Sequence, residues 1–153
     1  MNLEPPKQDL THLEKAIDSF VKLYPRVTDD EFMSQQDDII RMGLEAGLIQ
    51  NFEFTYELCW KEMKRWLEMN ISPGIADGVT RRELFRLAAE NLLIEDVEEW
   101  MTYHAARNGI VRQHNLKITR TVWLTLVNFG PAAQHLLSKL KEKQKYLSTI
   151  NHE

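Results

Sequence analysis

Between Asp38 and Met69 the chain carries apolar residues at helical spacing around most of the helix circumference. One stripe follows steps of three and four residues: Leu48, Phe52, Thr55, Cys59, Met63 and Trp66. Two further stripes lie beside it, the first formed by Ile49, Tyr56, Trp60 and Leu67 and the second by Phe54 and Leu58. A surface helix normally has one apolar stripe only slightly wider than about 100°. We therefore predict a central helix that is buried on several sides and also contacts a second subunit. The alternative is a helix buried entirely within one bundle.

The spacing of apolar residues is helical almost throughout the rest of the chain. With 6 glycines and 5 prolines, the chain also has too few turn residues for an all-β fold. The predicted fold is an all-α, up-and-down bundle of four to five antiparallel helices, forming a single domain over residues 1–153. A first helix is expected over 10–24, closed by Pro25, and a second helical stretch is expected after a capping box at Thr28–Glu31. Further helices are expected over 80–91, 95–108 and 119–148. The last of these should have a kink or a break at Pro131.

Several classes of protein are excluded by simple features of the sequence. No apolar run approaches the roughly 18 residues that span a bilayer, so we expect no membrane association. The first seven residues have no signal-peptide pattern, and Cys59, the single cysteine, cannot form an internal disulfide. We therefore expect a cytoplasmic protein.

The charges are unevenly distributed along the chain. The net charge is −4, which argues against general nucleic-acid coating, because phosphate binding needs a positive surface. From Trp100 to Lys141, however, there is no acidic residue, and the six positive charges are Arg107, Arg112, Lys117, Arg120, Lys139 and Lys141. This segment could bind a local anion such as a phosphate. Alternatively, it pairs with acidic helices of its own fold or of a partner.

One group of residues could carry chemistry, although the common catalytic and nucleotide-binding motifs are missing. It is found late in the helix predicted over 95–108: His104, Arg107, Asn108, Arg112 and His114. Arg107 and His114 are seven residues apart and so lie within about 20° of each other around a helix. An arginine can hold phosphate oxygens, and a histidine can exchange protons with a ribose hydroxyl or a leaving oxygen. Such a pair suffices for RNA cleavage without a metal or cofactor. The alternatives are a surface pair or a helix-capping arginine, and we interpret His104 as a hydrogen-bonded core histidine.

One segment of the central helix resembles a known family. The string is Leu48-Ile49-Gln50-Asn51-Phe52-Glu53-Phe54-Thr55-Tyr56-Glu57-Leu58-Cys59-Trp60-Lys61. It is similar to the signature helix of the nucleotidyltransferase substrate-binding proteins, the HepT-like branch of the HEPN superfamily. Looser similarity continues from about Arg41 through most of the chain, including Ser72-Pro73, Arg82 to Ala88, Arg107-Asn108 and His114.

The resemblance implies an all-α homodimer whose partner is a small MNT-type nucleotidyltransferase, often acting as the antitoxin to a HEPN toxin. The toxin is a ribonuclease that uses an arginine and a histidine with four to six residues between them. Carried over, Arg107 would bind the phosphate, His114 would be the acid and base, and Asn108 would support one of them. Arg112, Lys117 and Arg120 would bind RNA or nucleotide phosphates. No metal and no cofactor are expected.

Two departures from the family pattern concern the spacing between Arg107 and His114 and the regulation by the partner. The six residues between Arg107 and His114 make the gap longer than in close relatives. Leu116 stands where relatives carry the tyrosine to which the partner transfers AMP, so this control lacks its acceptor at the matching position. Two alternatives to a ribonuclease follow. One is a non-catalytic subunit that holds substrate or nucleotide for its nucleotidyltransferase. The other is a helical dimer with no anion site.

Overall fold

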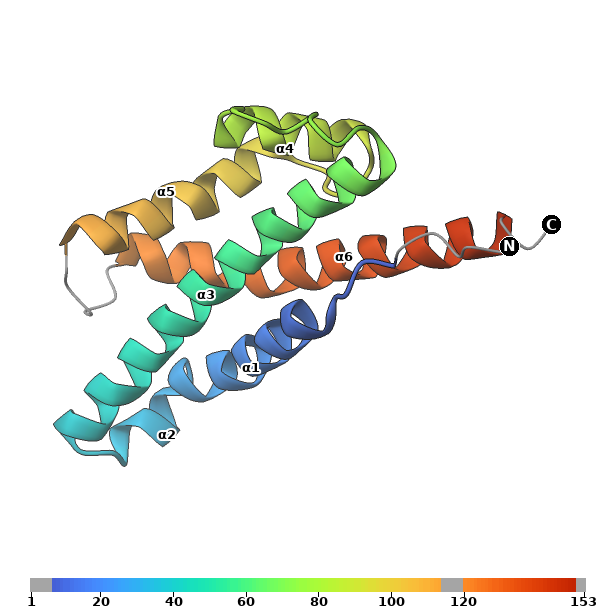
Figure 1. The fold of residues 1–153 in the computed structure, drawn as a ribbon. Coiled ribbons are helices and arrows are strands. Elements are labelled where there is room, and N and C mark those ends of the chain that lie inside the picture. The colour runs from blue at the N-terminus through green and yellow to red at the C-terminus, as the bar shows by residue number, and fades with distance from the viewer. Residues whose placement is uncertain (1–6, 114–119, 151–153) are drawn as a thin grey trace.

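The structure is a computed structural model that describes residues 7–113 and 120–150, with side chains described for 7–110 and 120–144. The described residues form six helices and no strands, which confirms the predicted all-α fold (Figure 1). The helices are α1 (Thr11–Val27), α2 (Asp30–Ser34), α3 (Asp38–Asn70), α4 (Arg81–Glu90), α5 (Val97–Gln113) and α6 (Arg120–Ile150). No helix within the described residues is long and apolar enough to cross a membrane.

The longest helix, α3, is the centre of the fold, as its apolar circumference predicts. It packs against α1, α4, α5 and α6 (Figure 1). The first predicted stripe is buried along its whole length, from Leu48 to Trp66. In contrast, Phe54 of the third stripe is 60% exposed. One side of α3 therefore remains uncovered by the described helices. Burial inside this bundle alone does not explain why apolar residues surround most of α3.

Aromatic rings fill the middle of the core. Phe129 of α6 lies edge-on to Phe20 of α1, Phe52 of α3 and Tyr103 of α5, with ring centroids 4.8–5.3 Å apart. Edge-to-face contacts of this kind add to the free energy gained from apolar burial. Cys59 is also fully buried, and burial raises the pKa of its thiol.

Side-chain caps fix the beginnings of several helices. The carboxylate of Asp37 accepts a hydrogen bond from the amide of Ile40 at 2.9 Å, which caps α3. The hydroxyl of Thr80 accepts one from the amide of Glu83 at 3.1 Å, so Thr80 caps α4 as the predicted capping box requires, while the carboxylate of Glu83 pairs with Arg86. Such caps satisfy amides that have no partner within the helix and contribute about 1 kcal/mol each.

Two predicted boundaries near the N-terminus are wrong. The first helix does not end before Pro25 but continues to Val27, which is buried. The hydroxyl of Thr28 donates to the carbonyl of Tyr24 at 2.9 Å and so closes α1. Because Thr28 is used there, α2 is capped instead by Asp29, whose carboxylate accepts from the amide of Phe32 at 3.0 Å.

The last helix runs through Pro131 as one element, so the expectation of a complete break there is wrong. Pro131 is exposed, while Gly130 before it is buried against the ring of Phe20. The proline ring therefore points away from the core and does not disturb the packing on α1. A kink at Pro131 stays a prediction.

Candidate functional site

A cluster of charged and polar side chains lies where α3, α4 and α5 meet. Its centre is an ion pair between Nη2 of Arg107 on α5 and Oε1 of Glu57 on α3, 2.8 Å apart. The side chains are 32% and 25% exposed, respectively, so water screens the pair only partly. The second terminal nitrogen of Arg107 donates to Oδ1 of Asn108 at 3.4 Å. Arg107 is therefore held in place by one carboxylate and one amide.

Asn108 connects Arg107 to a histidine and a tyrosine. Nδ2 of Asn108 lies 3.2 Å from Nε2 of His104, and Nδ1 of His104 lies 2.7 Å from the hydroxyl oxygen of Tyr56. A guanidinium can only donate, so Oδ1 of Asn108 must face Arg107 and Nδ2 must face His104. Nε2 of His104 then accepts, and its Nδ1–H donates to Tyr56. The donor direction thus runs from Arg107 through Asn108 and His104 to Tyr56.

This chain of hydrogen bonds requires a neutral His104, because a proton on Nε2 would face the amide protons of Asn108. The electrostatic surroundings favour the same state. Partial burial lowers the pKa of His104 below 6.5, and the positive charges of Arg81 and Arg107 lower it further, against a smaller opposing effect of Glu57. His104 is therefore neutral at pH 7, with its proton on Nδ1.

A second arginine enters the cluster from the first residue of α4. The guanidinium carbon of Arg81 lies 3.4 Å above the centroid of the Trp60 ring, a cation–π stack. Burial lowers the pKa of Arg81, and the charge of Arg107 acts in the same direction. Among the residues that the structure describes, Arg81 forms no ion pair with a carboxylate. It is thus a half-buried cation held mainly by an indole ring.

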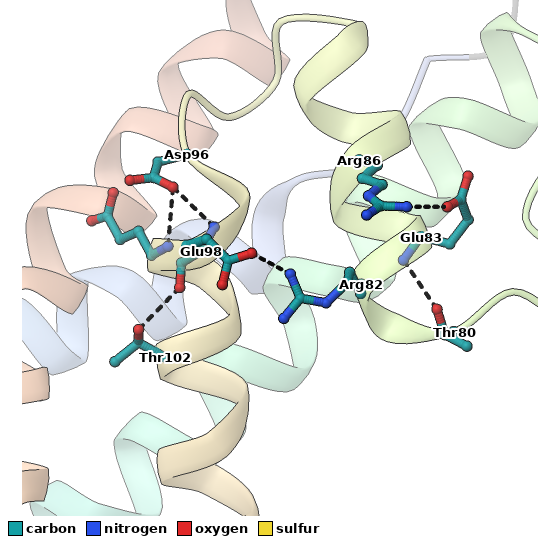
Figure 2. A network of polar contacts seen from close by, with 8 residues as sticks. Thr80, Arg82, Glu83, Arg86, Asp96, Glu98 and Thr102 are labelled. Atoms are coloured by element: carbon teal, nitrogen blue, oxygen red, sulfur yellow. Dashed lines mark hydrogen bonds and ion pairs between the residues drawn. The ribbon is translucent and has the colours of Figure 1, made fainter.

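A contact between α4 and α5 positions this corner of the site. Arg82 of α4 forms an ion pair with Glu98 of α5 (Figure 2). The carboxylate of Asp96 accepts hydrogen bonds from the amides of Glu98 and Glu99 at 2.9 and 3.3 Å, and so caps α5. The acidic start of this helix therefore has a structural role. It fixes the beginning of α5, on which His104, Arg107 and Asn108 follow two to three turns later.

The predicted site residues fall into two groups. The structure places Arg107 and Asn108 in hydrogen-bond contact. His104 is hydrogen-bonded, as predicted, but it is half-buried rather than a core residue. Arg120 is exposed at the first residue of α6. The remaining residues are not described. His114 and Lys117 lie outside the described residues, and Arg112 lies in α5 but its side chain is not described.

Four members of the cluster were not predicted: Tyr56, Glu57, Trp60 and Arg81. For Glu57 the sequence holds a usable signal, because Glu53 and Glu57 are one turn apart in an otherwise apolar part of α3. Half-buried acids need a cation, and the cationic segment that starts at Arg107 supplies it. The interpretation of this segment as pairing with acidic helices of its own fold is therefore confirmed for Arg107, and for Lys141, which pairs with Glu14 of α1 at 2.9 Å.

The two guanidinium groups of the cluster are suited to binding an anion, in competition with the carboxylates of Glu57 and Glu53. Two guanidinium groups face one ion-paired carboxylate, Glu57, and His104 is neutral. A second carboxylate nearby, Glu53, has its pKa raised by burial, which outweighs the opposite effect of Arg107. Arginine side chains that lie partly out of water bind phosphate or carboxylate oxygens strongly through their planar donor groups. Among the described residues, no group of three or more His, Cys, Asp or Glu side chains could hold a metal ion.

Comparison with known proteins extends this picture beyond the described residues. Residues 8–142 match the family model described as "Nucleotidyltransferase substrate binding protein like". The chain is 28% identical over 141 residues to a Haemophilus influenzae protein named "Probable ribonuclease HepT", covering 92% of this chain and 97% of that protein. A solved structure of HI0074 from Haemophilus influenzae, described as revealing the fold of a substrate binding domain of a nucleotidyltransferase, superposes with a TM-score of 0.80. It is 28% identical and covers 87% of this chain and 99% of its own.

Proposed function

Because the chain belongs to the nucleotidyltransferase substrate-binding protein family, we propose that it is a HEPN-type ribonuclease regulated by a cognate nucleotidyltransferase. The observation that carries the proposal is Arg107. Its guanidinium is half-buried and oriented by Glu57 and Asn108, in a cluster with a second guanidinium. The name of the Haemophilus influenzae relative supports the same activity.

The cleavage reaction in this proposal needs a side chain that accepts and donates protons and a side chain that stabilises negative charge on the phosphate. A base takes the proton of a ribose 2′-hydroxyl, and the 2′-oxygen attacks the adjacent phosphorus. The bond from phosphorus to the 5′-oxygen breaks, and an acid protonates that oxygen, so the products carry a 2′,3′-cyclic phosphate and a 5′-hydroxyl. Arg107 stabilises the negative charge that builds up on the phosphate oxygens. His114 is the proton acceptor and donor in this proposal.

Asn108 is a positioning residue in this scheme. Its carbonyl oxygen fixes one terminal nitrogen of Arg107, while its amide nitrogen is anchored on His104. A guanidinium held in advance in its binding orientation loses less conformational freedom when phosphate binds. Arg112, Lys117 and Arg120 are proposed to contact further phosphates of the RNA.

We also propose that the active form is a homodimer. Apolar side chains on α3 and α6 remain exposed: Phe54 is 60%, Leu124 63% and Val127 52% exposed. Exposed large apolar residues on neighbouring helices are typical of surfaces that bind another protein. A second copy of the chain would cover them and bring two Arg107 clusters into one assembly. The nucleotidyltransferase would then bind this dimer.

Cleavage of a fluorescently labelled single-stranded RNA by the purified protein tests the ribonuclease. We expect the wild type to cleave it, and Arg107→Ala and His114→Ala to lose most of the activity. Arg86→Ala, at an exposed arginine of α4, is the control that should cleave like the wild type. An RNA with 2′-deoxyribose at the cleaved position should remain intact, because it lacks the attacking oxygen. A wild type that leaves RNA intact with and without its partner enzyme contradicts the proposal.

A second candidate function is a non-catalytic subunit that holds substrate or nucleotide for the nucleotidyltransferase. It is favoured by the description of the HI0074 structure as a substrate binding domain. Co-expression with the cognate nucleotidyltransferase distinguishes the two candidates. The subunit hypothesis expects the partner's activity to depend on this chain and to survive His114→Ala. The ribonuclease hypothesis expects the wild-type chain, expressed without its partner, to arrest bacterial growth and His114→Ala to relieve that arrest.

A further inference from the structure

Arg81 is a charged side chain in the cluster that the proposed mechanism does not use. Its guanidinium carbon lies 3.4 Å from the centroid of the Trp60 ring, and its Nε atom, like that of Arg107, is buried without a hydrogen-bond partner among the described residues. Removing a guanidinium from water costs free energy unless an anion or hydrogen-bond acceptors compensate. Arg107 has a carboxylate for this purpose, but no carboxylate among the described residues pairs with Arg81.

The indole ring explains how Arg81 is held without such a partner. Stacking on Trp60 contributes a cation–π attraction and also restricts the plane of the guanidinium. The terminal nitrogens of a stacked guanidinium point outward from the ring edge, where they can donate to the oxygens of a ligand. The side chain is thus oriented before any ligand binds.

Arg81 and Arg107 act on the same neighbours. The positive charges of both lower the pKa of His104, and both act on Tyr56, although burial is the main cause of the raised pKa of Tyr56. His104 and Tyr56 therefore both experience the positive charges of Arg81 on α4 and Arg107 on α5. Glu57 influences both arginines, and among the described residues its ion pair is with Arg107.

We propose that Arg81 is a second phosphate-binding residue, which together with Arg107 forms a two-arginine clamp, and that Glu57 competes with phosphate for Arg107. The inference rests on the proposed function in that a phosphodiester is taken as the ligand. Phosphate supplies the anion that Arg81 lacks in the free protein. Two guanidinium groups from different helices also hold a phosphate more firmly than one, because each can donate two hydrogen bonds.

Binding of a fluorescein-labelled 2′-O-methyl RNA, measured by fluorescence anisotropy, tests the clamp without cleavage. Arg81→Met removes the charge but keeps a long side chain over Trp60, and we expect about tenfold weaker binding. Glu57→Gln frees Arg107 while keeping the shape of the side chain, and we expect tighter binding. Arg86→Met is the matched control, because Arg86 lies on the same helix, is exposed and pairs only locally with Glu83 (Figure 2).

The salt dependence of binding separates a lost phosphate contact from a damaged fold. Each phosphate contact to a single strand contributes about 0.7 to the slope of log affinity against log salt concentration. Arg81→Met should weaken binding and reduce that slope by no more than about 0.7, because Arg107 still contacts the same phosphate, whereas Arg81→Lys should keep the slope and lose part of the affinity. A parallel series with AMP distinguishes a phosphate in RNA from one in a free nucleotide, and dependence on Arg81 in either series supports the clamp.

The outcomes also separate this inference from the proposed function. If Arg107→Ala loses cleavage but Arg81→Met binds and cleaves like Arg86→Met, the clamp is wrong and the ribonuclease stands. If binding depends on Arg81 but the wild type never cleaves RNA, the clamp stands and the ribonuclease is wrong. If neither RNA nor AMP binds the wild type, both are wrong.

Discussion

The hydroxyl oxygen of Tyr56 on α3 accepts a hydrogen bond from Nδ1 of His104 on α5, across 2.7 Å. The two residues are 48 positions apart in the sequence, so this bond ties the central helix to the helix that carries Arg107. Tyr56 is fully buried, and burial raises the pKa of its hydroxyl, which remains neutral. The contact is therefore a neutral hydrogen bond that is buried on the tyrosine side and half-buried on the histidine side.

Tyr56→Phe removes this acceptor and leaves Nδ1–H of His104 without a partner. We expect the free energy of unfolding to fall by about 1–3 kcal/mol, which is the cost of an unsatisfied buried polar group. Urea denaturation followed by circular dichroism measures it. The control is Tyr24→Phe at a half-buried tyrosine of α1, for which the described part of the chain shows no hydrogen-bond partner of the hydroxyl. Equal stability losses in both variants would show that the bond to His104 contributes nothing specific.

The lowered pKa of His104 predicts a pH-dependent stability. The unfolded chain protonates this histidine near its ordinary value of 6.5, whereas the folded protein does so only at lower pH. Between the two values the unfolded state binds more protons, so the free energy of unfolding rises with pH and is lost as pH falls through the folded pKa. We expect lower stability at about pH 5 than at about pH 8, and a weaker dependence in His104→Gln.

The comparison requires a control for the other histidines. His12→Gln, at an exposed position in the first turn of α1, should keep the wild-type dependence on pH. If His104→Gln keeps the wild-type pH dependence too, protonation of His104 is not coupled to folding.

Leu92, directly after α4, has an unusual backbone conformation. Its φ is 62°, in the left-handed region, and it is the only residue other than glycine with a positive φ among those that the structure describes. The amides of Leu92 and Leu93 donate to the carbonyls of Ala89 and Ala88, the pattern that commonly ends a helix on a glycine. Leu92 is 68% exposed, so its side chain adds little packing.

Leu92→Gly should therefore relieve strain at the end of α4 without loss of core contacts. We expect the free energy of unfolding to rise by up to about 1 kcal/mol, after the larger backbone entropy of glycine in the unfolded chain is subtracted. Thermal melting measures the gain. Leu92→Ala is the control, since it shortens the side chain but keeps the strain. A melting temperature of Leu92→Gly at or below that of Leu92→Ala would contradict the argument.

The exposed side chain of Phe54 predicts where two copies of the chain meet. Phe54→Glu places a charge on this part of α3, and we expect the proposed dimer to dissociate while the helical circular dichroism is unchanged. Light scattering during gel filtration measures the mass. Ile39→Glu is the control, because Ile39 is 81% exposed but lies roughly 22 Å further along the same helix. A dimer that survives Phe54→Glu would place the interface elsewhere.

The helices were predictable where local chemistry determines them. Thr80 and Asp96 act on amides two or three residues away, so the sequence alone reveals the beginnings of α4 and α5. The end of α1 was not predictable in this way. It depends on the burial of Val27 against distant residues, which outweighs the tendency of Pro25 to end a helix.

The same distinction applies to the candidate site. Arg107 and Asn108 are neighbours on one helix, and their joint role follows from spacing. Glu57 and Arg81 join them from α3 and α4, and only the packing of three helices shows that they are close to the same His104. Trp60 belongs to the second apolar stripe predicted for the central helix, and its contact with Arg81 depends on where α4 begins.

Because Cys59 is completely buried in the core, the rate at which its thiol is labelled measures how often the bundle opens. A thiol reagent reacts with the thiolate, and here the thiol is both covered and reluctant to ionise. Reaction therefore waits until α3 separates from its neighbours. Because the chain has a single cysteine, the labelling rate of this chain measures the opening around α3, and the rates with and without a ligand can be compared.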